Sequence, residues 1–242
     1  GTEVRAGTQY TPDGSPNLSD LTFLPKAGFT GSVQIGYEGT DSRGKTFRGQ
    51  IRIQVNQGSG SRYFQDMGSY AWAAPYVDLL YEAGVITGTG GQRYRPADAV
   101  SRGDFMLMLY RAFQLTPASG AGFPDVPPGS YYAQAIQAAR AAGIASGYPD
   151  GGFHPQEPVT RQDAMVLLER TMQATGWSLG AANTGYLSGF RDGGMVAPYA
   201  QEAMSHMIEY GIITGTPEQK LNPIQSISRA EMAVMLARAI TF

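Results

Sequence analysis

The chain has 242 residues, of which 42% are hydrophobic and 16% are charged, with a formal net charge of −2 and no cysteine. The acidic balance argues against general nucleic-acid binding, which usually needs a basic stripe, and the absence of long apolar runs argues against membrane insertion. The lack of cysteine excludes disulfides and thiolate metal sites. A sparsely charged chain rich in glycine and tyrosine suits an extracellular protein that contacts sugars.

Residues 1–57 are predicted to be β-rich. Residues 32–37 and 47–55 alternate apolar and polar side chains, and a turn signal lies between them at 41–44. This pattern predicts a hairpin with one buried face. Residues 23–31 resemble the PxxGFTG stretch of bacterial immunoglobulin- or cadherin-like surface domains, although such sandwiches need roughly 100 residues. We therefore expect a partial domain of that kind or a spacer.

The remaining residues contain one pattern repeated three times. Each copy opens with Phe-x-Asp, continues to a five-residue word that begins and ends with glycine, and then reaches a proline followed by an arginine. So many landmarks do not stay in register three times by chance, and such a repeat determines the fold. The landmarks are Phe64, Asp66, Gly84, Gly88, Pro96 and Arg102 in the first copy, Phe123, Asp125, Gly143, Gly147, Pro155 and Arg161 in the second, and Phe190, Asp192, Gly211, Gly215, Pro223 and Arg229 in the third.

Each copy predicts two helices joined by a loop. The first helix ends at the first glycine of the word, which suits the left-handed position after a helix, and the second begins at a serine or threonine. Both helices carry apolar residues on one face. The inward positions are Val77, Leu80, Ile136, Ala139, Met204 and Met207 in the first helices, and Phe105, Leu109, Phe113, Ala164, Leu168, Met172, Met232, Leu236 and Ile240 in the second.

One helix pair cannot bury such a face alone, whereas three pairs can do so around a shared axis. We therefore predict a mainly α fold, a pseudo-three-fold trimer of helix–loop–helix modules that follows a small N-terminal β-rich segment. The predicted modules are residues 58–118, 119–180 and 181–242.

The second helices begin with similar four-residue sequences, which we call tetrads. The tetrads are Ser101-Arg102-Gly103-Asp104, Thr160-Arg161-Gln162-Asp163 and Ser228-Arg229-Ala230-Glu231. The hydroxyl and the acid form a capping box, which contributes roughly 0.5–2 kcal/mol to helix stability. The arginine, however, lies at the positive end of the helix dipole, where a cation is disfavoured by roughly 0.3–1 kcal/mol. Its position needs another explanation.

Two explanations of the tetrad arginines remain open. A helix start with free N–H groups and an arginine is a good site for a carboxylate or phosphate, so the partner could be an anionic ligand. The alternative is a structural salt bridge to the aspartate of Phe-x-Asp. A second set of arginines lies near the helix ends, where a cation is favoured, and needs no function. This second set is Arg111, Arg170 and Arg238.

The repeat resembles the S-layer homology (SLH) domain family. The resemblance rests on Phe-x-Asp, the glycine word, the tetrad and the loop at 148–155, and it covers residues 62 to 242 in three copies. It implies a non-catalytic module that anchors surface proteins to secondary cell-wall polymers. These often contain pyruvylated N-acetylmannosamine, bound in grooves between modules. It also implies the surface or cell wall of a bacterium, with Gram-positive bacteria favoured.

The family's ligand contact is the tetrad arginine, which corresponds to Arg102, Arg161 and Arg229 in this chain. The other candidate ligand-binding residues are Asp104, Asp163, Glu231, Gly88, Gly147, Gly215 and Trp72. Departures from the family pattern, such as Gly103 and Gln162 in place of alanine, suggest that the grooves are not equivalent. We expect Arg161 to matter most, because its module has the most complete loop.

A different class of function also fits the repeat, namely a structural module that assembles a surface lattice through protein–protein contacts. An enzyme that cleaves glycans would need paired carboxylates in one cleft, and nothing singles out such a pair. His154 and His206 lie on different predicted elements, so no zinc site is expected. Asp150 is expected to form a turn, and Trp177 to stack on a sugar or pack in the core. We expect no cofactor.

Overall fold

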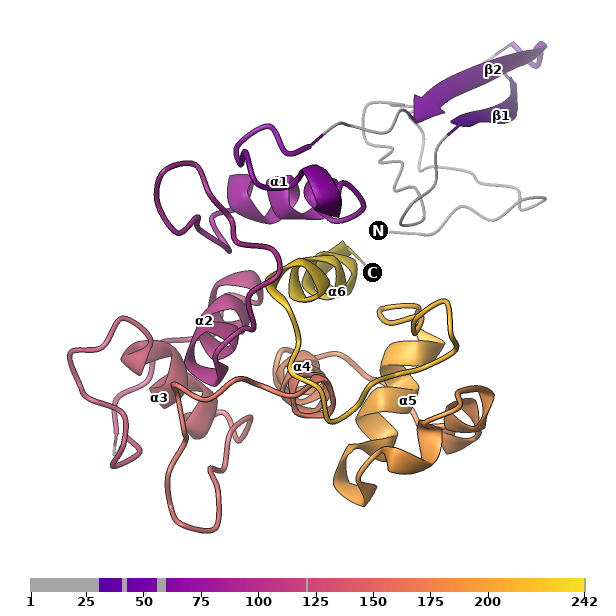
Figure 1. Cartoon of the computed structure of the whole chain (residues 1–242). Helices are drawn as coiled ribbons and strands as arrows, with labels where there is room; N and C mark the ends of the chain where they lie inside the picture. Colours follow the sequence, from indigo (N-terminus) through magenta and orange to yellow (C-terminus); the bar gives the residue numbers. More distant parts are fainter. Residues whose placement is uncertain (1–30, 41–42, 56–59, 121, 242) are drawn as a thin grey trace. The chain divides into compact units, whose positions relative to one another are not determined.

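The computed structural model describes residues 31–40, 43–55, 60–120 and 122–241. The chain divides into two units, Gly1–Ser59 and Gly60–Phe242, and each is considered by itself. The first contains the two strands and the second contains the helices (Figure 1). Among the described residues, no helix combines the length and the apolar composition that crossing a bilayer requires.

The described part of the first unit is an antiparallel hairpin of β1 (Gly31–Thr40) and β2 (Thr46–Val55), which confirms the predicted hairpin. The register pairs Ile35 with Ile51 on one face and Glu38 with Arg48 on the other. The apolar face is only partly covered by the described residues, since Ile35 is 37% exposed. The predicted buried face is therefore not seen. Residues 23–30, which carry most of the resemblance to immunoglobulin-like domains, lie outside the described residues.

The second unit contains three copies of a short helix followed by a longer one, as the repeat predicts. The first helices are α1 (Ala74–Glu82), α3 (Ala133–Ala141) and α5 (Gln201–Glu209), and the second helices are α2 (Arg102–Ala112), α4 (Arg161–Ala174) and α6 (Arg229–Thr241). Short 3₁₀ turns occupy Gly68–Tyr70, Thr184–Gly189, Gly193–Met195 and Pro198–Ala200.

The predicted helix ends are confirmed by local geometry. The glycines that follow the first helices, Gly84, Gly143 and Gly211, have φ values of 71°, 72° and 68°, in the left-handed region where glycine carries no steric penalty. At the start of α2, the Ser101 hydroxyl accepts the N–H of Asp104 at 3.1 Å. Thr160 and Ser228 cap α4 and α6 in the same way.

The packed helix pairs join consecutive modules. α3 packs against α2, α5 packs against α4, and α1 packs against α6, so that the first helix of each module lies on the second helix of the module before it. α2, α4 and α6 gather at the centre and the first helices lie outside them (Figure 1). The predicted inward positions are buried, although Phe113 and Ile240 are only partly covered.

A ring of three backbone hydrogen bonds closes the pseudo-three-fold arrangement. Val100 donates its N–H to the carbonyl of Ile227, Ile227 donates to Val159, and Val159 donates to Val100, over 3.0, 3.1 and 2.9 Å. All three residues are buried. Each precedes a tetrad, so the ring fixes the starts of α2, α4 and α6 relative to one another.

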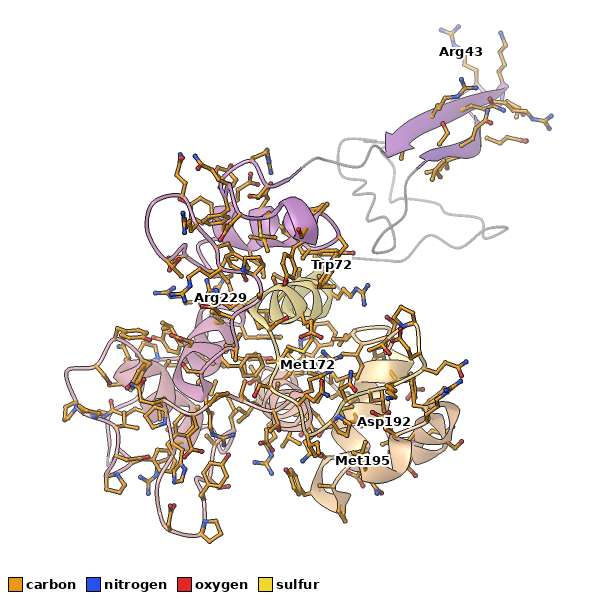
Figure 2. All side chains as sticks on the ribbon, viewed as in Figure 1. Arg43, Trp72, Met172, Asp192, Met195 and Arg229 are labelled. Carbon is orange, nitrogen blue, oxygen red and sulfur yellow. The ribbon has the colours of Figure 1, made fainter. Side chains whose placement is uncertain are left out.

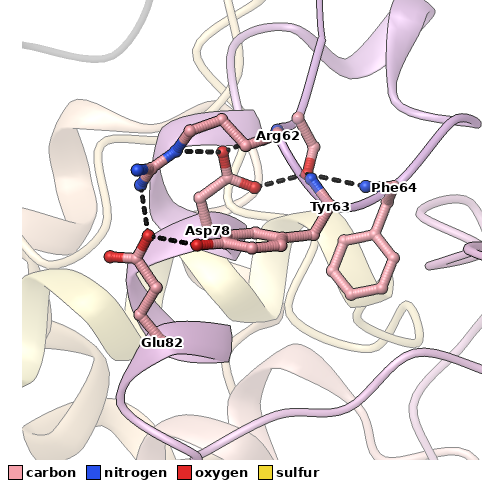
Figure 3. A network of polar contacts seen from close by, with 6 residues as sticks. Arg62, Tyr63, Phe64, Asp78 and Glu82 are labelled. Carbon is pink, nitrogen blue, oxygen red and sulfur yellow. Dashed lines mark hydrogen bonds and ion pairs between the residues drawn. The ribbon is translucent and has the colours of Figure 1, made fainter.

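A polar network fixes the beginning of the first module to α1 (Figure 3). Asp78, which is buried, accepts hydrogen bonds from the Ser61 hydroxyl and from the Arg62 N–H, the latter at 2.9 Å. One turn further along α1, Glu82 accepts from the Tyr63 hydroxyl at 2.7 Å and pairs with Arg62 at 2.5 Å. The other two modules have no acid at the position of Asp78.

Candidate functional site

Each tetrad arginine lies on the loop of the next module, in a closed circle. Arg229 donates from Nε to the carbonyl of Tyr94 at 2.7 Å, and its guanidinium lies 4.5 Å from the centre of the Tyr94 ring. Arg161 donates from Nε to the carbonyl of Leu221 at 2.8 Å. Arg102 lies 4.9 Å from the ring centre of Phe153. Each of the three arginines therefore lies at a junction between two modules.

This circle corrects the reasoning that singled out Arg161. The complete loop at 148–153 belongs to the second module, but the arginine above it is Arg102, from the first module. The Arg102 guanidinium lies 4.9 Å from the centre of the Tyr148 ring, and its Nε is buried with no hydrogen-bond partner among the described residues.

The expectation of free N–H groups at the helix starts is wrong. The N–H groups of Arg102 and Gly103 donate to the carbonyls of Glu157 and Pro155, each at 2.8 Å. The corresponding groups of α4 and α6 also donate to carbonyls of the next module, and the third N–H of each helix goes to the cap hydroxyl. Because these donors are used, any anion at the junction has to be held by side chains.

The alternative of a salt bridge to the Phe-x-Asp aspartate is also wrong. Asp66 instead accepts the N–H groups of Tyr94 and Arg95, both at 2.8 Å. Burial raises the pKa of Asp66, but these backbone N–H groups outweigh it and bring the pKa below its ordinary value. Asp125 and Asp192 hold the loops of their own modules in the same way.

A tyrosine from the next module reaches the tetrad acid at two of the three junctions. Tyr131 donates its hydroxyl to Asp104 at 2.6 Å, and Tyr199 donates to Asp163 at 2.8 Å. Desolvation of the hydroxyl, followed by the hydrogen bond to Asp104, raises the pKa of Tyr131 to about 12. The rings of both tyrosines are exposed, as is the indole of Trp72, which occupies the same position in the repeat.

These residues define three sites, each made of a tetrad arginine, a tetrad acid and an exposed aromatic residue. Site A is Arg229, Asp104 and Tyr131, and site B is Arg102, Asp163 and Tyr199. Site C is Arg161 and Glu231, and Trp72 is assigned to it by its position in the repeat. Arg229 and Trp72 are labelled in Figure 2. Site A contains a pocket of about 290 Å³, lined by Val85, Ile86, Thr87, Gly88, Thr89, Asp104, Leu107, Met108, Arg111, Tyr131 and Arg229.

The glycines predicted to bind ligand have a steric explanation. A Cβ atom on Gly88 would lie 2.6 Å from the ring of Phe64, the phenylalanine of the Phe-x-Asp element. Gly147 and Gly215 meet the equivalent rings in the same way. Close packing of that ring therefore requires glycine whether or not a ligand binds. Gly88 also lines the pocket of site A.

The arginines near the helix ends bind the carbonyls at the ends of the first helices. Arg238 donates to the carbonyl of Ile212 at 3.2 Å, and Arg170 donates to that of Ile144 at 3.3 Å. Arg111 makes the equivalent contact with Val85 and also lines the pocket of site A. The sequence analysis overlooked Arg111 as a site residue, and it did not include Tyr131 and Tyr199. The repeat could have identified the tyrosines, because they lie as far before the helix-ending glycine as Trp72 does.

The histidines, Asp150 and Trp177 make contacts within the fold. His206 is buried, and its Nδ1 lies 2.5 Å from Glu169. His154 lies between Asp150 and Glu157 within one loop, and Asp150 also accepts the N–H of Gly152, as expected of a turn former. Trp177 is partly buried against the core. No cluster of metal-ligating side chains occurs in the described part of the chain.

Comparison with known proteins identifies the repeat. The family described as "S-layer homology domain" matches residues 63–106, 122–165 and 189–233, together more than half of the chain. Domains of this family occur in cell-surface proteins and anchor them to the cell wall without catalysing a reaction. The match indicates a cell-surface protein associated with the cell wall.

Known relatives come from Gram-positive bacteria. An endoglucanase of Bacillus sp. (strain KSM-635) is 28% identical over 72% of this chain and 18% of its own length. The surface-layer 125 kDa protein of Lysinibacillus sphaericus is 29% identical over 73% of this chain and 14% of its own. An amylopullulanase of Thermoanaerobacterium thermosulfurigenes is 29% identical over 68% of this chain and 9% of its own. The chain thus spans less than a fifth of these relatives, and the three repeats show that it belongs to the S-layer homology domain family.

Proposed function

We propose that the helical unit anchors its parent protein by binding an acidic saccharide of the cell wall at the junctions between modules. The observation that carries this proposal is the pocket of site A. Two arginines, Arg229 and Arg111, line it together with one acid, Asp104, and the exposed ring of Tyr131. Guanidinium groups recognise carboxylates through paired N–H donors, and an exposed aromatic face packs against a sugar ring.

The ligand class follows from the residues at the three sites. A tetrad arginine occurs in each of the three copies, and a pyruvylated N-acetylmannosamine unit supplies both a carboxylate and a pyranose face. The tetrad acids can accept hydrogen bonds from the hydroxyl groups of a sugar, in addition to the tyrosine hydroxyls that Asp104 and Asp163 already accept. At a junction that takes the saccharide, the tetrad arginine (Arg102, Arg161 or Arg229) would bind the anion, and the tetrad acid (Asp104, Asp163 or Glu231) would bind sugar hydroxyls. The exposed aromatics Trp72, Tyr131 and Tyr199 would contact the ring.

Isothermal titration with two matched saccharides tests this assignment. A short saccharide that carries pyruvylated N-acetylmannosamine should bind the chain, and the same saccharide without the pyruvyl group should bind at least about tenfold more weakly, since a charge-assisted hydrogen bond typically contributes 1.5–3 kcal/mol. Equal affinity for the two forms would overturn the anionic-ligand assignment.

A lattice-assembly role is the second candidate, and the relative named as a surface-layer protein favours it. Purified cell-wall sacculi separate the two functions. A wall-binding module should be captured by intact sacculi and lost when the attached polymer is removed, whereas a module that acts only through protein–protein contacts would be indifferent to the polymer.

A further inference from the structure

The three sites differ in how the charge of the tetrad arginine is balanced. At site C, Arg161 Nη1 lies 3.0 Å from Glu231 Oε1, and the Arg161 side chain is only 13% exposed. At site A, the Arg229 guanidinium donates to the carbonyls of Tyr94 and Thr87 and lies over the Tyr94 ring, and it pairs with no carboxylate of the described residues. At site B, the Arg102 guanidinium makes no hydrogen bond or ion pair with the described residues, and it lies over the rings of Tyr148 and Phe153. Only the charge of Arg161 is therefore met by a carboxylate within its own site.

Two departures within the third junction explain this pair. The tetrad acid is glutamate at Glu231, whereas the other two sites have aspartate, and the extra methylene lets its carboxylate reach the arginine of the preceding module. The aromatic residue is Trp72 rather than tyrosine, so the hydroxyl that holds Asp104 and Asp163 has no counterpart at site C. Glu231 keeps its capping role as well, because Oε2 accepts the N–H of Ser228 at 2.9 Å while Oε1 faces Arg161.

We propose that site C is closed to the acidic saccharide by the Arg161–Glu231 ion pair, so that sites A and B alone bind it. This inference rests on the proposed function and assigns the occupancy of its three sites. A carboxylate ligand that enters site C has to displace Glu231 from Arg161. The negative charge of Glu231 also repels the ligand carboxylate, because the two carboxylates compete for the same guanidinium. At site B the guanidinium needs no such displacement, so Arg102 makes the strongest contribution to binding.

The position of Trp72 provides a direct measurement of site C. The chain has two tryptophans, Trp72 and Trp177, and Trp177 is partly buried against the core just beyond the C-terminal end of α4, whereas the α4 tetrad lies at the other end. In a proton–nitrogen NMR spectrum, the Trp72 indole N–H reports on site C, while isothermal titration gives the number of saccharides bound. In the unmodified full chain we expect two bound saccharides and an unshifted Trp72 indole resonance at concentrations that fill sites A and B.

The substitution Glu231→Gln should open site C. Glutamine still serves in a capping box, so the start of α6 is retained while the charge on Arg161 is released. We expect a third bound saccharide and a Trp72 indole resonance that shifts on titration, with an affinity at site C at least about tenfold higher than before. Glu209→Gln is the matched control, since it removes the same charge from an exposed position on α5 outside the three sites. Glu209→Gln should still bind two saccharides per chain.

The outcomes separate this inference from the proposed function. The closure of site C would be overturned by three saccharides bound to the unmodified chain, or by a Trp72 indole resonance that shifts while sites A and B fill. Either result would leave the proposal of saccharide binding intact. An unchanged stoichiometry in Glu231→Gln would overturn the closure of site C as well. No saccharide binding by the unmodified chain would overturn the proposed function. If Glu231→Gln melts at a much lower temperature, Glu231→Asp provides the second test, because aspartate occupies the equivalent position in the first turn of α2 and α4.

Discussion

The N–H of Val100 donates to the carbonyl of Ile227 over 3.0 Å, which joins the loop of the first module directly to that of the third. Val159 completes the ring between them, and all three side chains are buried. Helix packing also joins the first module to the third, since α1 lies against α6. The first and last modules are therefore parts of one core rather than the ends of an open array.

Deletion of residues 181–242 should unfold the rest of the helical unit. The deletion removes α6, so α1 loses the helix against which it packs, and the hydrogen-bond ring opens. We expect the shortened chain to show no cooperative thermal transition when the melt is followed by circular dichroism. A cooperative melt close to that of the full chain would contradict the shared core.

Gly103→Ala should destabilise the protein although alanine is the better helix former. A Cβ atom at this position would lie 3.0 Å from the ring of Tyr132 and 3.0 Å from the carbonyl oxygen of Pro155. Overpacking of this kind typically costs about 1–3 kcal/mol. In a Tyr132→Ala background the cost should fall, because the junction between the third and first modules has alanine at both equivalent positions, Ala230 and Ala73. Chemical denaturation of the double-mutant cycle measures this coupling, and additive effects would argue against it.

The Phe-x-Asp aspartates should make the protein sensitive to acid. Because backbone N–H groups lower the pKa of Asp66 and Asp125 in the folded state, their contribution is fully present above the ordinary carboxyl value of about 3.8 and is lost as the pH falls through the lower folded value. We expect Asp66→Asn and Asp125→Asn to lower the melting temperature at pH 7 and to flatten its fall below about pH 4. An unchanged acid profile in both variants would contradict this role.

The two sets of arginines should separate stability from affinity. Arg102→Ala should weaken binding of the acidic saccharide about 10- to 100-fold. The melting temperature should fall only slightly, because the side chain loses its contacts with the rings of Tyr148 and Phe153 but no hydrogen bond or ion pair. Arg238→Ala should lower stability by about 0.5–1.5 kcal/mol through the lost bond to Ile212 and leave affinity unchanged. The measurement pairs melting temperature with saccharide affinity for each variant. Loss of stability with full affinity in Arg102→Ala would make that arginine structural.

Arg111→Ala should lower both the melting temperature and the saccharide affinity, in contrast to Arg238→Ala, which should lower only the first. Arg111 donates to the carbonyl of Val85 and also lines the pocket of site A, where it lies with Arg229. We therefore expect a small loss of stability and a weaker affinity confined to one of the bound saccharides. Affinity equal to that of the unmodified chain would restrict Arg111 to the structural role that its place at the helix end suggests.

The sequence by itself determined the repeat, the helices and their ends. Left-handed glycines such as Gly84 and capping hydroxyls such as that of Ser101 act within a few residues, so their effect can be read from local spacing. The apolar spacing likewise identified the buried positions, of which Val77 and Leu168 are fully covered. The sequence also showed that the tetrad arginine is in an unfavourable position. The interaction of a side-chain charge with the helix dipole depends on its position along the helix, which can be read from the sequence.

Only the tertiary structure decided which module each arginine serves. The N–H groups at the start of α2 face carbonyls of the next module, and Arg102 lies over that module's loop, so neither partner is near in sequence. The Arg161–Glu231 pair depends on the circular closure of three modules, since its two residues belong to the tetrads of different modules. Spacing along the chain records the period of a repeat, but the partner of a side chain at a junction is set by how the copies pack around their common axis.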